Sequence, residues 1–278
     1  MKKINRRSFL AAAGLTAAAL ALTACGGSAS STASSTASSA ASSEAASTSA
    51  AAELTTVEAG KLTMATNAAF PPYEMTTDAG EFEGIDIDTA KAIAEKLGLE
   101  LQIDDMDFDA ALLSVQQGKA DIVMAGVTVT DERKAVMDFS DSYATGIQSI
   151  IVPNDSDIAS PDDLSGKKIG TQRGTTGYIY CSDDFGEDSV VAYDSGLTAV
   201  QALNNGQVDA VVIDNAPATE YVAANPGLKV LDTSYAEEDY AIGMAKGSAL
   251  EDAVNKALEE LKADGTLQAI VDKYINAN

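Results

Sequence analysis

The sequence contains no histidine and no tryptophan, and its only cysteines are Cys25 and Cys181. Without histidine, a His-based catalytic triad and a histidine general base are excluded, and a zinc site would need cysteine or carboxylate ligands. Two cysteines could form at most one disulfide. Because Cys25 is expected to be modified, as argued below, we expect a folded part without disulfides, in which Cys181 is a buried small hydrophobic residue.

Positive charge is also scarce, with 18 Lys and Arg against 42 Asp and Glu and a formal net charge of −24. Nucleic acids and anionic lipids are bound by clustered Lys and Arg, so we expect neither as an electrostatic partner. The sequence also lacks the GxxxxGK[ST] motif of ATP-binding loops. This absence argues against ATP binding by this chain, and the residues suggest no cofactor and no metal.

Residues 1–24 have the order of an export signal, with a basic start followed by an apolar run over Phe9–Ala24. This run is shorter than the about 20 residues of a membrane-spanning helix. It ends in Leu22-Thr23-Ala24-Cys25, which resembles the bacterial lipoprotein processing box, where the cysteine thiol receives a lipid and becomes the mature N-terminus. Arg6-Arg7 also resembles a twin-arginine motif, so the export route stays open.

Residues 25–55 are expected to form the lipid-modified Cys25 and a flexible linker. From 26 to 52 the sequence contains only Gly, Ser, Ala and Thr apart from Glu44, so it has no large apolar side chain to bury. Serine and threonine weaken the alternative, an alanine-rich helix. A flexible chain of this length has a root-mean-square span of roughly 26–31 Å. The linker would connect a membrane anchor to a body of about 220 residues, enough for two modest lobes.

The body alternates strand-like and helix-like segments, which is typical of an α/β fold. The expected strands are 61–66, 99–103, 120–125, 149–152 and 167–171, and the expected helices are 85–97, 108–117 with Asp107 as cap, and a helical segment over 250–275.

One sequence pattern recurs within the body and suggests two lobes of related build. Residues 115–123 and 203–211 both follow the order of a helix end, a glycine, an aspartate and an apolar strand. Ligands of open α/β sheets bind beyond the carboxyl ends of strands. The polar residues that follow these two strands, Gly126 to Thr128 and Asp214 to Asn215, are therefore candidates for a site.

Several segments, in order, resemble the polar amino-acid solute-binding proteins of ABC importers, the family 3 extracellular or periplasmic solute-binding lipoproteins. No single segment is decisive, but together they span Lys61 to Tyr274. The segments are Asn67-Ala68-Ala69-Phe70-Pro71-Pro72-Tyr73-Glu74, Phe82-Glu83-Gly84-Ile85-Asp86-Ile87-Asp88, Ala125-Gly126-Val127-Thr128-Val129-Thr130-Asp131-Glu132-Arg133, Asp138-Phe139-Ser140-Asp141, Gly174-Thr175-Thr176-Gly177 and Val211-Val212-Ile213-Asp214-Asn215-Ala216-Pro217-Ala218.

The resemblance implies a type II periplasmic-binding-protein fold of class α/β, in which two crossover hinge strands join two lobes. Lobe 1 would be discontinuous, over 56–147 and 238–278, and lobe 2 would span 148–237. The implied protein is not an enzyme but a monomeric receptor, outside the cytoplasm and held at the bacterial cell surface or in the periplasm by its lipid alone. It would capture a free L-amino acid and deliver it to an ABC permease and its ATPase.

Two other functions stay open at this point. A sensor domain that presents the amino acid to a signalling partner would have the same binding residues. An enzyme on the same scaffold, similar to cyclohexadienyl dehydratases, would need a carboxylate aimed at a substrate proton, and the ligand-binding segments contain no unassigned acid that suggests one.

An amino acid is a zwitterion, and its burial requires a cation for its carboxylate and an anion for its ammonium group. Arg133 has a planar guanidinium suited to bidentate carboxylate binding. Without the resemblance, an arginine at such a position would more often be part of a surface ion pair. The backbone N–H groups of Thr128 and Thr176 could share the carboxylate. Asp214, helped by the Gly126 carbonyl and the Thr128 hydroxyl, would bind the ammonium group, or it could cap the helix that follows it.

Phe70 and Phe108 match positions where the family places aromatic residues around the ligand side chain, although either could be ordinary core. Asn67 has an amide where binders of basic amino acids commonly have an acid. We therefore predict a neutral, mid-sized, partly polar ligand such as glutamine or cystine, ahead of arginine, lysine or histidine. Acidic ligands rank second if Arg173 turns inward, but a solvated loop charge is favoured there.

Overall fold

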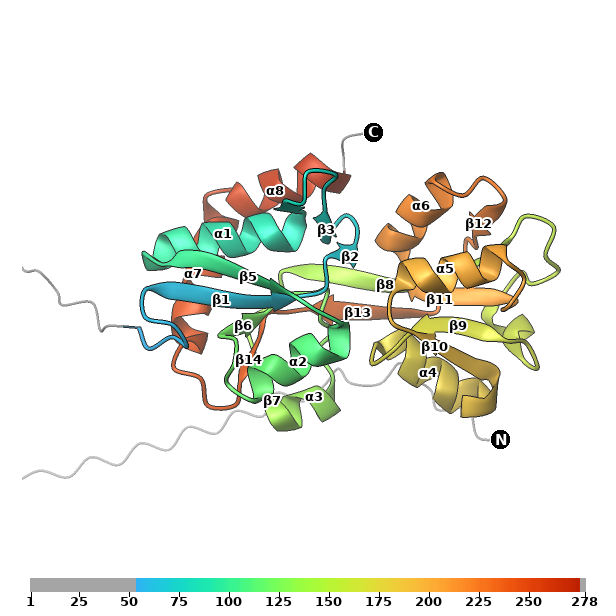
Figure 1. The fold of residues 1–278 in the computed structure, drawn as a ribbon, viewed down its shortest axis with the longest axis horizontal. Coiled ribbons are helices and arrows are strands. Elements are labelled where there is room, and N and C mark those ends of the chain that lie inside the picture. Colours follow the sequence, from blue (N-terminus) through green and yellow to red (C-terminus); the bar gives the residue numbers. More distant parts are fainter. Residues whose placement is uncertain (1–53, 276–278) are drawn as a thin grey trace, which may run out of the picture. The chain divides into compact units, whose positions relative to one another are not determined.

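Two separate β-sheets organise residues 54–275, the part of the chain that this computed structural model describes (Figure 1). The chain divides into two units, residues 1–49 and 50–278, and the described residues all belong to the second. The predictions for the export signal, for Cys25 and for most of the linker therefore concern residues outside the described range.

The first lobe is built on a five-stranded sheet with the order β5-β1-β6-β14-β7. β1 runs parallel to β5 and to β6, whereas β14 is antiparallel to β6 and β7 and brings a late segment of the chain back into this sheet. The strands are β1 (Lys61–Thr66), β5 (Glu100–Asp105), β6 (Ile122–Val123), β7 (Met137–Phe139) and β14 (Gly243–Ala245).

The second lobe has its own sheet, in the order β10-β9-β11-β8-β12, and β13 also pairs with β8. β8 and β13 both run between the two lobes (Figure 1) and pair antiparallel along five residues. The strands are β8 (Ala144–Pro153), β9 (Ile169–Gln172), β10 (Val190–Tyr193), β11 (Ala210–Asp214), β12 (Leu228–Val230) and β13 (Ala236–Tyr240).

The remaining elements cover these sheets or lead into the space between the lobes. A small antiparallel sheet is formed by β2 (Ala69–Phe70), β3 (Glu74–Thr76) and β4 (Phe82–Glu83). The α-helices are α1 (Ile85–Leu97), α2 (Phe108–Gln116), α3 (Asp131–Val136), α4 (Thr176–Phe185), α5 (Gly196–Asn204), α6 (Asn215–Ala223), α7 (Glu251–Ala263) and α8 (Thr266–Ile275), and Pro161–Leu164 and Glu187–Ser189 are short 3₁₀ helices.

α1 shows how the sequence determines one of these elements. Its apolar residues recur at helical spacing, and Ile85, Ala90 and Ile93 are completely buried. The helix ends at Gly98, whose φ of 70° is readily adopted only by a residue without a side chain. α7 and α8 pack against α1, so the C-terminal segment closes the core of the first lobe.

The recurring sequence pattern has a structural counterpart in both lobes. α2 is followed by Asp121 and β6, and α5 is followed by Asp209 and β11. The Asp121 carboxylate accepts the backbone N–H of Thr63 at 2.8 Å, and the Asp209 carboxylate accepts that of Lys168 at 2.8 Å. Each aspartate thus satisfies a backbone donor at or just before a neighbouring strand.

Three local predictions differ from the structure. The strand predicted over 120–125 is limited to the two residues of β6, because the chain turns toward the space between the lobes at Gly126. β8 is longer than the predicted 149–152, since it continues across to pair with β13. Asp107 occupies the N-cap position of α2, but its side chain makes no capping hydrogen bond.

No helix within residues 54–275 is long and apolar enough to span a membrane.

Gly84 gives a test of the packing between α1 and the small sheet. Its φ is 132°, and a Cβ atom there would overlap the carbonyl oxygen of Tyr73. We expect Gly84→Ala to lower the free energy of unfolding by about 3 kcal/mol or more, measured by urea denaturation. The matched control is Gly80→Ala, where φ is 81° but no atom lies within 4 Å of the added carbon, so only about 1–2 kcal/mol of backbone strain is expected. Equal losses in both variants would contradict the steric argument.

Candidate functional site: a pocket between the lobes

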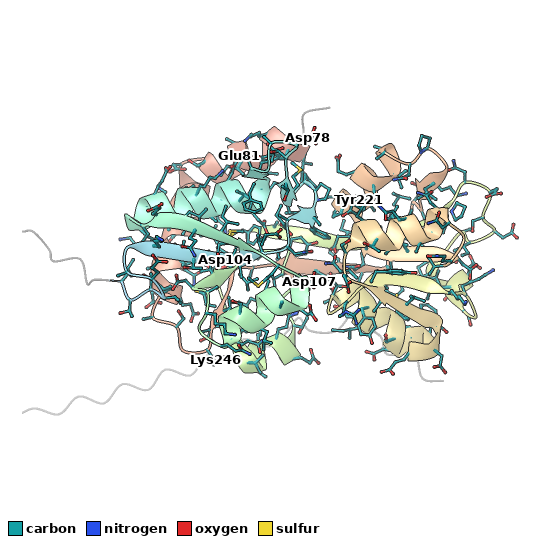
Figure 2. All side chains as sticks on the ribbon, viewed as in Figure 1. Asp78, Glu81, Asp104, Asp107, Tyr221 and Lys246 are labelled. Atoms are coloured by element: carbon teal, nitrogen blue, oxygen red, sulfur yellow. The ribbon has the colours of Figure 1, made fainter. Side chains whose placement is uncertain are left out.

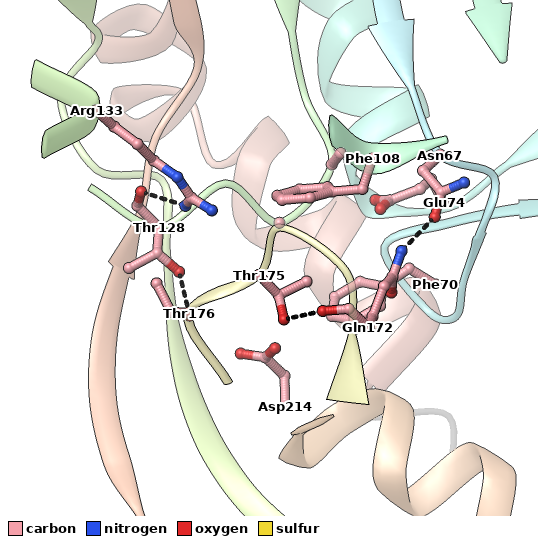
Figure 3. Close-up of a pocket in the computed structure, with 12 residues that line it drawn as sticks. Asn67, Phe70, Glu74, Phe108, Thr128, Arg133, Gln172, Thr175, Thr176 and Asp214 are labelled. Carbon is pink, nitrogen blue, oxygen red and sulfur yellow. Dashed lines mark hydrogen bonds between the residues drawn. The ribbon is translucent and has the colours of Figure 1, made fainter. Parts of the chain in front are cut away.

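A pocket with about 310 Å³ of empty space, which includes open solvent, lies where the two lobes meet. The structure brings all eight residues predicted to bind ligand together around it (Figure 3); that they bind one stays a prediction. The first lobe contributes Asn67, Phe70, Glu74, Phe108, Ala125, Gly126, Thr128 and Arg133, and the second contributes Gln172, Thr175, Thr176 and Asp214.

Arg133 is buried, with 9% of its surface exposed, and is not a surface ion pair. The Thr130 hydroxyl accepts the Arg133 backbone N–H and caps α3, which fixes where the side chain begins. Nη1 donates to the Thr128 carbonyl oxygen at 2.8 Å, and Nη2 donates to the Gly174 carbonyl oxygen of the other lobe at 3.1 Å. The guanidinium carbon lies 5.4 Å from the centre of the Phe108 ring. Burial lowers the pKa of Arg133 below its usual value.

Asp214 ends β11 at the other charged end of the pocket (Figure 3). It occupies the N-cap position of α6, but its side chain makes no capping hydrogen bond. Its Oδ1 instead accepts a hydrogen bond from the Tyr240 hydroxyl. Burial raises the pKa of Asp214 to about 7, with the nearby Glu238 adding to the shift. The carboxylate is therefore available for a cationic partner rather than committed to the helix.

Glu238, on β13, collects hydrogen bonds from both sides of the pocket. Its Oε2 accepts from the hydroxyls of Thr128 at 3.2 Å and Thr176 at 3.0 Å, and from the Gln148 amide at 2.9 Å. Because these two hydroxyl protons point at Glu238, the threonine oxygens present lone pairs elsewhere. The two hydroxyls are thus oriented as acceptors, which suits an ammonium group more than a carboxylate.

Hydrogen bonds also join the lobes beside the pocket. The Asn67 amide donates to the Met106 carbonyl oxygen at 2.9 Å, and its oxygen accepts from the Gln172 amide at 2.9 Å. The Tyr221 hydroxyl, on the second lobe (Figure 2), donates to the Ala69 carbonyl oxygen at 2.5 Å. The Asn67 amide is therefore already used on both sides, although the residue still lines the pocket.

Glu74 and Asp86 form a fully buried carboxyl pair behind the aromatic wall, and both residues are 0% exposed. Asp86 Oδ2 accepts the Gly126 N–H at 3.0 Å and the Tyr143 hydroxyl at 2.8 Å. Glu74 accepts no N–H or O–H hydrogen bond from the described residues, and its polar contact is with the carboxyl of Asp86. Burial raises the pKa of Asp86 to about 6 and that of Glu74 well above 4.5.

Sequence reasoning passed over Glu74, Gln172 and Glu238. Glu74 stands beside an apolar and aromatic segment, and an acid in that setting is a signal of burial that could have been used. Gln172 and Glu238 carry no such signal, because a polar residue at a strand end is ordinarily solvated. Arg173 is 53% exposed and forms a 3.1 Å ion pair with Asp194, as expected for a loop charge.

The described residues hold no group of three or more Cys, Asp or Glu side chains placed to bind a metal ion. The arrangement instead offers one buried cation, a separate buried carboxylate and aromatic walls between them. These features suit the binding of a small zwitterion.

The sequence profile of the bacterial extracellular solute-binding proteins, family 3, matches residues 62–277. The chain belongs to this family. Its fold is accordingly the two-lobed type II periplasmic-binding-protein fold, and like its relatives it is a substrate-binding protein and not an enzyme.

Relatives within the family resemble nearly the whole body of this chain. A probable histidine-binding protein of Neisseria gonorrhoeae is 33% identical over 98% of this chain and 96% of its own. The L-cystine-binding protein TcyJ of Escherichia coli K12 is 32% identical over 80% and 85%. An ancestral arginine-binding protein was solved bound to arginine (44% identity, TM-score 0.74) and bound to glutamine (43%, 0.73), each covering 78% of this chain and 98% of the other.

Alanine substitutions test the two charged residues at the ends of the pocket, Arg133 and Asp214, and Arg173 provides a control. We expect Arg133→Ala to weaken amino-acid binding about 30-fold to several-thousand-fold, because the partner charge would lose a buried contact of ~2–5 kcal/mol. Arg173→Ala should leave affinity unchanged, since that side chain is exposed. Asp214→Ala should show a loss like that of Arg133→Ala. Calorimetry measures the affinities, and a cooperative thermal transition verifies folding. Affinity kept within threefold would remove that residue from the site.

Proposed function

We propose that this protein captures a free L-amino acid outside the cytoplasm and delivers it, as a monomer, to an ABC permease and its ATPase. The observation that carries the proposal is the placement of Arg133 and Asp214, two buried groups of opposite charge, on the same pocket. The ligand carboxylate would bind the guanidinium, and its ammonium group would bind Asp214 and the two threonine oxygens. Amino-acid recognition by the relatives and the absence of an ATP-binding motif support this assignment.

For the ligand side chain, a neutral and partly polar group is our first candidate. Phe70 and Phe108 offer flat apolar walls, and Glu74, when protonated, is a neutral carboxyl whose carbonyl oxygen can accept a hydrogen bond from an amide NH2 group. The ancestral arginine-binding protein bound to glutamine and the cystine-binding relative support glutamine or cystine as examples.

A cationic side chain is the second candidate, and a specific observation favours it. Glu74 is buried at the pocket without an N–H or O–H donor among the described residues, so an ionised Glu74 would lack a partner unless the ligand supplied one. The arginine-bound ancestral structure and the histidine-binding relative support this class.

A melting-temperature screen of the purified protein against the common amino acids tests the proposal. A ligand that binds only the folded state raises stability by about 2.7 kcal/mol at a hundredfold excess over Kd. We expect upward shifts with glutamine or cystine, and smaller or no shifts with acidic amino acids. A protein that responds to no free amino acid, including at tenfold higher concentration, would refute the proposed function.

We further infer that Cys25 carries the lipid that holds the protein at the membrane, since the processing box, the basic start and the linker composition all meet at this residue. Cys25→Ser should move the protein from the membrane fraction to the soluble extracytoplasmic pool, as measured by fractionation and immunoblotting. Cys181→Ser is the matched control and should leave the distribution unchanged. A Cys25→Ser protein that stays with the membrane like the wild type would refute the anchor.

A further inference from the structure

The pocket contains more acids than its cation can balance. Among the described residues that line it, Arg133 is the only cation, whereas Glu74 and Asp214 are acids and Glu238 and Asp86 lie directly behind them. Glu238 is stabilised by three donors and Asp214 by Tyr240. Glu74 has only the carboxyl of Asp86, and two ionised carboxylates cannot remain in contact in a buried site without a cation beside them.

A single proton shared by Glu74 and Asp86 removes the repulsion between their two carboxylates. Asp86 accepts two hydrogen bonds from Gly126 and Tyr143, which favour its ionised form. Glu74 has no such donors, so the shared proton resides on Glu74 and is donated to Asp86. The pair then carries one negative charge in place of two.

Glu74 also occupies the part of the pocket that the ligand side chain would reach. In Figure 3 its carboxyl lies beside Asn67 and on the opposite side of Phe108 from Arg133. A ligand whose carboxylate binds Arg133 and whose ammonium group binds Asp214 would extend its side chain between Phe70 and Phe108, toward Glu74.

We propose that Glu74 is a proton switch that lets one pocket bind two classes of amino acid. With a neutral side chain Glu74 keeps its proton, whereas a cationic side chain displaces that proton to the solvent and binds the carboxylate that remains. The ligand brings one positive charge and the carboxyl loses one proton, so the total charge of the pocket is the same in both complexes. This inference rests on the proposed function, because it assumes that the pocket binds amino acids.

Other titratable groups near Glu74 must be separated from it in any test. Asp214 also holds a proton near neutrality, and every amino acid displaces it through the common ammonium group. The effect of Asp214 therefore cancels between two ligands that differ only in the side chain. The groups that face Glu74 are Tyr73 beside it, Asp86 on α1, Asp105 on β5, Tyr143 before β8, Asp214 at the end of β11, Tyr221 on α6 and Arg133 across the pocket.

The experiment is calorimetry of the purified full chain with arginine and with glutamine, at about pH 7, in buffers of different ionisation enthalpy. The dependence of the observed enthalpy on the buffer gives the number of protons released. We expect arginine to release about one proton more than glutamine. Glu74→Gln should abolish this difference and weaken arginine binding about thirtyfold or more, while glutamine binding stays within a few-fold. The control is Glu81→Gln, which should behave as wild type. Glu81 is an exposed acid in the turn that connects β3 and β4 of the same small sheet (Figure 2).

The wild-type protein supplies a second measurement if Glu74→Gln does not fold. The ratio of arginine affinity to glutamine affinity should rise by up to tenfold per pH unit over the range in which Glu74 is ionised in the arginine complex and protonated in the glutamine complex. Equal proton release by both ligands, or a ratio independent of pH, would overturn the switch. Binding of glutamine but not of arginine would overturn it and leave the proposed function intact, whereas binding of no amino acid would overturn both.

The pH dependence of stability without ligand is an independent test of whether Glu74 is protonated. A carboxyl whose folded pKa exceeds its unfolded value binds more protons in the folded state, so its contribution to stability falls as pH rises above about 4.5, the unfolded value for Glu74. Melting temperature should therefore decline less steeply with rising pH in Glu74→Gln than in wild type or Glu81→Gln. Identical slopes in all three would mean that Glu74 is ionised in the empty pocket, contrary to the proposal.

Discussion

The buried guanidinium of Arg133 is the interaction on which the arrangement of the pocket depends. Its two terminal nitrogens donate to carbonyl oxygens of different lobes, Thr128 in the first and Gly174 in the second. A buried cation is tolerated only with close partners, so both backbone segments must keep their positions for Arg133 to remain inside. The carboxylates of Glu238 and Asp214 stabilise the same charge from a distance. The positions of these two backbone segments and the burial of the Arg133 charge therefore depend on each other.

The acids of the pocket illustrate different solutions to the same problem of buried negative charge. One carboxylate oxygen of Glu238 accepts hydroxyl and amide donors, and Asp214 has a tyrosine hydroxyl together with a pKa near neutrality. Glu74 and Asp86 share a proton. Each solution leaves a different chemical surface, namely oriented hydroxyl oxygens, a carboxylate ready for a cation, and a neutral carboxyl. A protein with a net charge of −24 thus builds a pocket that is not uniformly negative.

Local elements could be predicted from the sequence where the causes are themselves local. The bounds of α1 follow from its apolar spacing and from Gly98, and the Thr130 cap of α3 follows from a threonine placed before Asp131-Glu132. The residues facing the pocket could be named because they lie at strand ends and in recognisable segments.

The partners of those residues could not be predicted in the same way. Gln172 contacts Asn67 from 105 positions away in the sequence, and Glu238 gathers donors from segments that meet only when both lobes are in place. The prediction of a neutral ligand uses the Asn67 amide by itself, and the hydrogen bond from Gln172 of the other lobe changes what that amide can do. The buried pairing of Asp86 with Glu74 could not be predicted either, because an acid in the first turn of a helix is ordinarily explained by the helix dipole.

The pairing of β8 with β13 has a mechanical consequence. The two connections between the lobes are hydrogen-bonded from Ala144 and Tyr240 to Gln148 and Ala236, so they form a single ribbon and not two independent tethers. Such a ribbon resists sliding within its plane, where hydrogen bonds would break, and bends more readily out of it. Tyr240 belongs to this ribbon and holds Asp214 through its hydroxyl. Bending of this ribbon would therefore also move the hydroxyl group that holds Asp214 in the pocket.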